Sequence, residues 1–205
     1  MRIGGVVLCG GESRRMGRPK AWLAFGNEVM LQRVVRVLAG VVDPVLVVSG
    51  VGQDLPDLPG GVEVAQDEVP DKGPLQALVN GLKLFSGRVE AVYATSCDVP
   101  LLKPEFVSHL AALLDNFEAV APEESNRAHP LAAVYRVSVL SKAEELLGDG
   151  HLRLSKLLDR CRTRRVQVQD LQGVDSTLQS LRNVNTPEDY VSLLEQAGLT
   201  SPEGL

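Results

Sequence analysis

The sequence has few cysteines, and their placement excludes two kinds of site. Three occur among the 205 residues, at Cys9, Cys97 and Cys161, and no two have the CxxC spacing of a structural zinc site. An odd number of widely separated cysteines also gives no disulfide framework. We therefore expect reduced thiols and a cytoplasmic location.

The chain also lacks an excess of basic residues and a long apolar run. It has 21 lysines and arginines against 26 acidic residues, a net charge of -5, whereas a nucleic-acid-binding face needs a concentrated positive excess. The apolar run at the N-terminus is too short for a signal peptide or a membrane span. We expect neither a nucleic-acid partner nor membrane association.

Alternating apolar patterns predict the fold class. Hydrophobic residues make up 44% of the chain, and its length suits one domain. Buried strands are expected at residues 3–8, 45–48, 62–65 and 90–95, and helices at 30–38, 73–85 and 104–114. The valine-rich segment 30–38 leaves a strand open as an alternative. The alternation predicts an α/β fold with three layers and a doubly wound, mostly parallel sheet, which binds ligands beyond the carboxyl ends of its strands.

The second half of the chain is less regular but continues the same pattern. Strands are expected at residues 119–121, 131–135 and 165–168, and helices near 139–147, near 152–161 and from Pro187 onward. No internal repeat or low-complexity linker separates the halves. We expect a single domain over residues 1–192, followed by a helix end and a frayed tail at residues 193–205.

The first strand leads into a glycine-rich basic loop that suits a triphosphate. Residues 8–20 read LCGGESRRMGRPK. Glycines let backbone amides approach phosphate oxygens, and the arginines and lysine add positive charge. The loop matches neither the GxxxxGK[ST] of phosphate-cradling NTPases nor the GxGxxG dinucleotide fingerprint. By composition alone, a surface turn remains an alternative.

The full loop resembles the signature LxGGxSxRMGxxK of nucleotidyltransferases that activate sugar phosphates and pterin cofactors. Within that superfamily the chain resembles the molybdenum cofactor guanylyltransferases, which attach GMP from GTP to molybdopterin. Further segments follow in the family's order, so the resemblance covers residues 3 to about 190. They are Gln66-Asp67 with Gly73-Pro74-Leu75, Cys97-Asp98-Val99-Pro100, His129-Pro130-Leu131, and Asn183 to Asp189.

The resemblance implies a nucleotide site in the first half of the chain. Its members would be Leu8, Cys9, Gly10, Gly11, Lys20, Ser49, Asp67 and Asp98. Arg15, Lys20 and Asp98 would be catalytic, the two cations by holding phosphates. Cys9 stands where the family usually has alanine, so we expect a buried, inert thiol. Asp98 follows a buried strand, where its carboxylate can hold Mg²⁺.

The resemblance also implies an acceptor site in the second half. His129, Asn183 and Asn185 would contact molybdopterin. The imidazole could donate to the acceptor, and the amide groups of the two asparagines match a pterin's hydrogen-bonding edge. A structural role remains open for His129, a turn role for Asp67 with Asp71 as its rival, and a helix cap for Thr186-Pro187. Molybdoenzymes or other cofactor-biosynthesis proteins are expected as transient partners.

The implied reaction transfers GMP from GTP to molybdopterin and releases pyrophosphate, with Mg²⁺ as cofactor. The segment Gly73-Pro74-Leu75 resembles the guanylyl branch of the family. The alternatives are a molybdopterin cytidylyltransferase, a sugar-phosphate nucleotidyltransferase, and a non-catalytic GTP-binding adaptor.

Overall fold

The computed structural model describes residues 1–10, 16–67 and 73–200 of the chain. Gly11 and Arg15, both expected in the phosphate-binding loop, lie outside the described residues, as does Asp71.

Eight strands of the described chain form one twisted sheet, in the order β10-β7-β9-β6-β1-β4-β5 with β8 paired to β7. Parallel pairs join β1 to both β4 and β6, β4 to β5, and β7 to β10. The strand β9 runs antiparallel between β6 and β7. The mostly parallel sheet predicted from the sequence is confirmed. The strands are β1 (Ile3–Cys9), β4 (Val45–Ser49), β5 (Val62–Gln66), β6 (Ala91–Ser96), β7 (Ala119–Glu124), β8 (Arg127–Ala128), β9 (Ala132–Arg136) and β10 (Thr163–Gln167).

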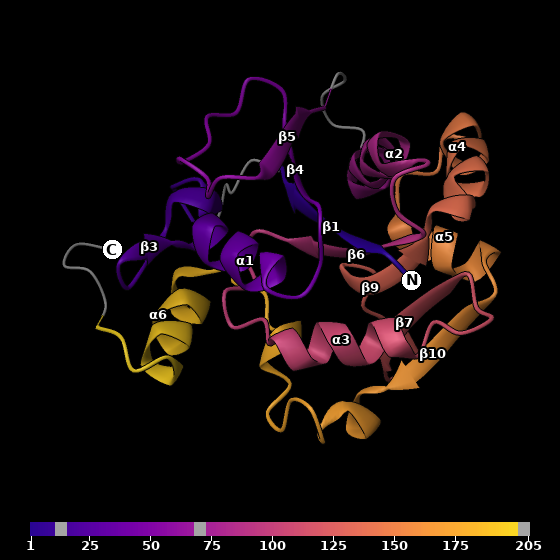
Figure 1. Ribbon diagram of the computed structural model, residues 1–205. Helices are drawn as coiled ribbons and strands as arrows, with labels where there is room; N and C mark the ends of the chain where they lie inside the picture. The colour runs from indigo at the N-terminus through magenta and orange to yellow at the C-terminus, as the bar shows by residue number, and fades with distance from the viewer. Residues whose placement is uncertain (11–15, 68–72, 201–205) are drawn as a thin grey trace.

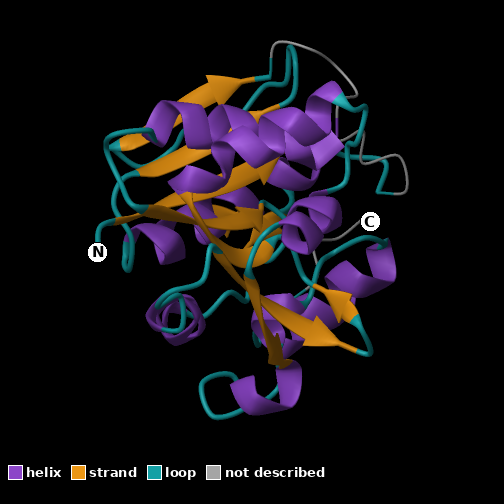
Figure 2. Ribbon diagram, turned by 90° about the vertical axis from the view of Figure 1, so that its right-hand side faces the viewer, coloured by secondary structure: helices purple, strands orange, loops and turns teal. Residues whose placement is uncertain are grey.

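Helices cover both faces of this sheet. On one face lie α1 (Met30–Ala39) and α3 (Pro104–Ala112), and on the other α2 (Gly73–Phe85), α4 (Leu140–Gly148) and α5 (Leu154–Arg160) (Figure 1). Figure 2 shows the strands between these layers. Side chains alternate along β1, so Val6 packs toward α2 while Val7 packs toward α1. The three-layer architecture is confirmed, and segment 30–38 is a helix, since burial of its apolar stripe outweighs the strand preference of valine.

A third, smaller core joins the two ends of the chain. The hairpin of β2 (Ala24–Phe25) and β3 (Glu28–Val29) packs with α6 (Pro187–Gln196), which lies beside it in Figure 1. The hydroxyl of Tyr190 donates a hydrogen bond of 2.6 Å to the carbonyl of Ala24. This contact fixes the last helix against the segment that follows Lys20. Helices of the 3-10 type are η1 (Lys20–Trp22), η2 (Val137–Val139), η3 (Val168–Leu171) and η4 (Gln179–Leu181).

The path of the chain through the sheet creates a place for a ligand. From β1 the chain moves outward to β4 and β5, then returns to form β6 on the other side of β1. At the carboxyl ends of this pair, Leu8 lies opposite Ser96. Open α/β sheets bind ligands at such a switch point. Within the described residues, no helix has the length and apolarity needed to span a membrane.

Candidate active site

The carboxylate of Asp98 is the centre of a polar cluster beyond the end of β6. Ser96 Oγ donates to Asp98 Oδ1 at 2.5 Å, and Asn183 Nδ2 donates to the same oxygen at 2.9 Å. Lys20 Nζ donates to Oδ2 at 2.7 Å. Asp98 is only 7% exposed, and a buried carboxylate needs such partners. The structure therefore brings together the expected Lys20, Asp98 and Asn183.

Asn185 joins this cluster through Lys20, whose ammonium donates to Asn185 Oδ1 at 3.0 Å. A capping box holds the asparagine: Asp189 Oδ2 accepts from the backbone amides of Asn185 and Thr186, both at 2.9 Å. Thr186 Oγ1 accepts from the Asp189 amide at 3.2 Å, and Pro187 occupies the first turn. The hydrogen bonds from these backbone amides lower the pKa of Asp189. The predicted helix cap is confirmed, and it fixes the backbone that carries Asn185.

The backbone of Lys20 is fixed by a short turn. Lys20 begins η1, and its carbonyl accepts a hydrogen bond from the amide of Leu23 at 3.2 Å. Ala21 is fully buried, and the indole of Trp22 donates to the carbonyl of Asp54 at 3.1 Å. Lys20 is thus presented by a turn whose next two residues are anchored by burial and by a hydrogen bond.

Ser96 was not predicted from the sequence. It lies at the end of β6, is 9% exposed, and contacts both Asp98 and Asn183. The available signal was its position two residues before Asp98, because residues two apart at a strand end point to the same side. Serine is also common in turns, which makes that signal weak.

The end of β1 places Cys9 and Gly10 beside this cluster. Cys9 is fully buried, as expected, and Gln53 Nε2 donates to its sulfur at 3.5 Å. A hydrogen bond with Cys97 lowers the pKa of Cys9 and raises that of Cys97. Gly10 is exposed, and the carbonyl before it accepts a hydrogen bond from Gly50. All three cysteines of the chain are free and buried.

Asp67 and Ser49 lie farther along the same edge of the sheet. Ser49 is buried, and its hydroxyl donates to the carbonyl of Ala65 at 3.4 Å, inside the sheet. Asp67 follows β5, its amide bonded to the carbonyl of Ser49 at 2.9 Å. Asn80 donates to Asp67 Oδ1 at 2.7 Å, and burial raises the pKa of this carboxyl while that hydrogen bond lowers it.

The backbone of His129 is fixed between β7 and β9. Its amide donates to the carbonyl of Pro122 at 2.8 Å, and its carbonyl accepts from Ala132 at 3.1 Å. Burial lowers the pKa of the imidazole, which is therefore neutral at pH 7. Within the described chain, no hydrogen bond connects His129 to Lys20, Asp98 or the two asparagines.

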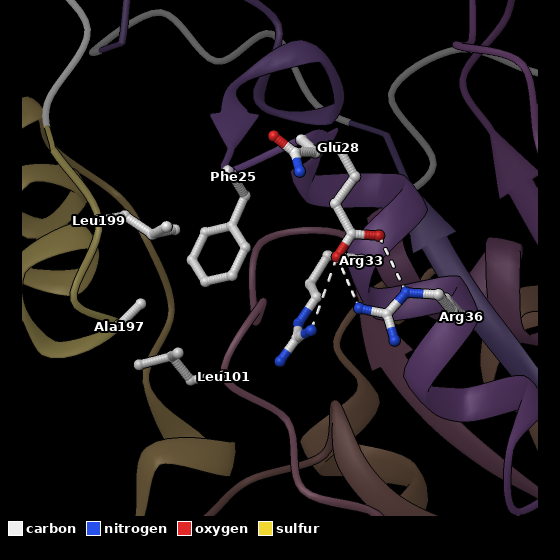
Figure 3. Close-up of a pocket in the computed structure, with 9 residues that line it drawn as sticks. Phe25, Glu28, Arg33, Arg36, Leu101, Ala197 and Leu199 are labelled. Carbon is white, nitrogen blue, oxygen red and sulfur yellow. Dashed lines mark hydrogen bonds and ion pairs between the residues drawn. The ribbon is translucent and has the colours of Figure 1, made fainter.

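A pocket of about 640 Å³ opens elsewhere, between the β2–β3 hairpin, α1 and the end of α6 (Figure 3). Its walls include Phe25, Arg33 and Leu199, with the Arg33 guanidinium 5.5 Å from the centre of the Phe25 ring. It contains none of the predicted site residues. Arg33 Nε also donates to the carbonyl of Pro100 at 3.2 Å, which ties this region to the loop after Asp98.

The described residues contain no cluster of three or more His, Cys, Asp or Glu side chains that could hold a metal ion. A divalent cation at Asp98 would therefore take most of its ligands from elsewhere. Mg²⁺ fits that donor set, because it binds through one or two carboxylates and completes its shell with waters and substrate phosphates.

Comparison with known proteins identifies the family. The model of the MobA-like NTP transferase domain matches residues 5–166. A probable molybdenum cofactor guanylyltransferase of Mycobacterium avium is 35% identical over 201 residues, which cover 95% of this chain and 96% of that protein. The chain belongs to the MobA-like NTP transferase family. It is a nucleotidyltransferase, as the first loop indicated.

Solved structures share the fold of this MobA-like transferase. Molybdopterin-guanine dinucleotide biosynthesis protein A from Archaeoglobus fulgidus matches with a TM-score of 0.79 and 22% identity, over 95% of this chain and 98% of that one. A Mycobacterium tuberculosis protein in complex with manganese matches with a TM-score of 0.68 and 20% identity, over 95% and 99%. At these identities the likeness establishes the nucleotidyltransferase fold.

Proposed function

We propose that this MobA-like transferase moves GMP from GTP to molybdopterin and releases pyrophosphate, in the synthesis of molybdopterin guanine dinucleotide. The observation that carries the proposal is the Lys20–Asp98 pair at the switch point of the sheet, with a 2.7 Å contact between the two side chains. The Mycobacterium avium relative carries the name of this activity. We place the reaction in the cytoplasm, where the three free cysteines would remain reduced.

The residues at the site suit a direct transfer between two substrates. The terminal phosphate of the acceptor attacks the α-phosphorus of GTP, and pyrophosphate leaves. The phosphate oxygens replace Asp98 as the partner of the Lys20 ammonium, which then offsets charge on the leaving group. Arg15 is proposed to share this role. Leu8, Cys9, Gly10, Gly11, Ser49 and Asp67 are proposed to shape the rest of the nucleotide site.

Asp98 is the proposed ligand of Mg²⁺, with Ser96 and Asn183 orienting its carboxylate. When bound, the cation would offset charge on the phosphates and align them for displacement. The fold relative from Mycobacterium tuberculosis was solved with manganese, a cation that accepts the same oxygen ligands. The proposal therefore rests on the chemistry of the donor set and on that related fold.

The acceptor is proposed to bind on the side of the cluster formed by Asn183 and Asn185, with His129 as a further proposed contact. Both asparagines already contact the Lys20–Asp98 pair. A pterin placed there would lie next to the nucleotide phosphates, which is the proximity that the transfer needs. Molybdoenzymes or other cofactor-biosynthesis proteins are the proposed recipients of the product.

Pyrophosphate release in a purified system with GTP, Mg²⁺ and molybdopterin tests the proposal. Lys20→Ala and Asp98→Ala should each lower turnover at least about 100-fold while the thermal transition stays cooperative. Lys83→Met is the matched control, because it removes a lysine from an exposed ion pair with Glu144. Near-normal turnover in either site variant would contradict the assigned roles.

Substrate panels distinguish the related activities. The proposal expects GTP to support transfer better than CTP, ATP or UTP. A preference for CTP would show a cytidylyltransferase, and transfer to a sugar phosphate instead of molybdopterin would show a different acceptor class. GTP binding without any pyrophosphate release would show an adaptor.

A further inference from the structure

A chain of two hydrogen bonds runs along one face of α2 and ends on Asp67. Gln76 Nε2 donates to Asn80 Oδ1 at 3.0 Å, and Asn80 Nδ2 donates to Asp67 Oδ1 at 2.7 Å. Gln76 and Asn80 are one helical turn apart, so their side chains are neighbours on the helix surface. Both are half-buried, which limits competition from water.

The hydrogen bond from Gln76 determines which end of the Asn80 amide faces Asp67. An asparagine amide has one accepting and one donating end. Because Gln76 donates to the oxygen of Asn80, the NH₂ group of Asn80 faces Asp67. The reverse orientation would place the amide oxygen against an ionised carboxylate, which is unfavourable.

Close packing of α2 on β1 fixes the position of Asn80. At the next residue, Gly81, an added Cβ would lie 2.9 Å from both methyl carbons of Val6. The helix therefore approaches the strand more closely than a larger residue would allow. Leu78 and Leu82 are fully buried on the same helix. Asn80 is thus held by packing as well as by its hydrogen bonds.

Asp67 has one carboxylate oxygen occupied and one available. Its amide is bonded to Ser49 and its Oδ1 to Asn80, while Oδ2 accepts no hydrogen bond from a described residue. An ionised carboxylate only accepts hydrogen bonds. A ligand group that forms a hydrogen bond with Oδ2 must therefore be an N–H or O–H donor, and a nucleotide offers both, in its ribose hydroxyls and in the amine of its base.

We propose that Asn80, oriented by Gln76, is a positioning residue that aims Asp67 Oδ2 at an N–H or O–H donor of the bound nucleotide. The inference rests on the proposed function, since it takes Asp67 to be part of the nucleotide site. It assigns Asn80 to nucleotide affinity, whereas Lys20 and Asp98 act in the transfer step.

Asn80→Leu tests the proposal, because leucine has a similar size and no hydrogen-bonding group. The KM for GTP and the Kd measured by calorimetry should rise about tenfold, with kcat changed by less than about twofold. Gln76→Leu should give a smaller rise in the same direction. Gln196→Leu is the control, because the exposed Gln196 donates to Ser192 one helical turn away on α6, at 3.1 Å, and accepts from Arg182 at 2.9 Å, and this variant should leave the KM unchanged.

A double-mutant cycle with Asp67→Asn separates positioning from a general structural effect. If Asn80 acts through Asp67, Asn80→Leu should change the Kd for GTP little in the Asp67→Asn background. An equal rise in both backgrounds, or a fall in kcat at unchanged KM, would overturn the proposal.

Nucleotide analogues identify the donor. If the donor is the 2′-hydroxyl, the protein should bind GTP more tightly than 2′-deoxy-GTP, and if it is the base amine, more tightly than inosine triphosphate. Asn80→Leu should reduce the preference for GTP over that one analogue. A preference unchanged by Asn80→Leu for both analogues would overturn the proposal. Because these are binding measurements, they remain valid if the wild-type protein releases no pyrophosphate, a result that would refute only the proposed transfer activity.

Discussion

The contact between Lys20 and Asp98 predicts that removing the lysine strengthens metal binding in the absence of nucleotide. The ammonium lies 2.7 Å from Asp98 Oδ2, and Ser96 and Asn183 occupy Oδ1. A divalent cation that binds this carboxylate must compete with a positive charge already placed there. Lys20→Ala removes that competitor and leaves the carboxylate in place.

The size of the effect follows from the charges involved. Two unit charges about 4 Å apart repel by about 1 kcal/mol in water and by about 4 kcal/mol at an effective dielectric constant of 20. A divalent cation doubles these values. The side chains of Lys20 and Asp98 are 18% and 10% exposed, so the environment lies between the two limits. Even the lower limit, about 2 kcal/mol, corresponds to roughly 30-fold tighter binding.

Manganese titration followed by water-proton relaxation measures this affinity directly. Lys20→Ala should bind Mn²⁺ at least about 30-fold more tightly than the wild type in the absence of nucleotide, although it should be the less active enzyme. A non-hydrolysable GTP analogue should tighten Mn²⁺ binding to the wild type, since phosphates draw Lys20 away. Equal affinities of wild type and Lys20→Ala, or an equal gain in the exposed control Lys83→Met, would refute the reasoning.

Three further predictions concern stability and the thiol. Gly81→Ala should destabilise the protein by about 1–3 kcal/mol in urea unfolding, because the contact of 2.9 Å with Val6 outweighs the better helix propensity of alanine; a stabilised variant would contradict this packing. Thr186→Ala should lower the free energy of unfolding by about 1 kcal/mol. Asp189 completes the same cap, and its pKa is lowered in the folded state. Its contribution to stability should therefore be present near neutral pH and lost as the pH falls through that folded pKa, which unfolding at several pH values would show. Cys9→Ala should retain turnover, and its loss would implicate the thiol in catalysis.

Much of the fold was predictable because its signals are local and repeated. The buried strands β1 and β4 are short runs rich in valine, and the period of α2 is regular. The β2–β3 hairpin was not predicted, because strands of two residues show no periodicity. The core formed by this hairpin and α6 joins residues more than 150 positions apart, a pairing that no local pattern contains.

The candidate site was predictable where a motif marks it and not where only folding creates it. Lys20 and Asp98 stand in recognisable motifs, and the structure places them in contact. Ser96 and Asn80 belong to no motif. Ser96 is relevant through a hydrogen bond of 2.5 Å to Asp98, two residues away, and Asn80 through one of 2.7 Å to Asp67, which follows a different element. The sequence shows which residue types are present. Which of them form hydrogen bonds to each carboxylate depends on how the helices and strands pack.

Under the proposed function, the two asparagines would let one cluster serve both substrates. Asn183 uses its NH₂ group on Asp98 and Ser96, so its amide oxygen has no partner among the described residues. The amide oxygen of Asn185 accepts a hydrogen bond from Lys20, and its NH₂ group donates no hydrogen bond to a described residue. One remaining acceptor and one remaining donor match the mixed hydrogen-bonding edge of a pterin. Binding of the acceptor would then hold both amides in place and keep Asp98 and Lys20 oriented, so loss of either asparagine should weaken acceptor binding and slow the transfer together.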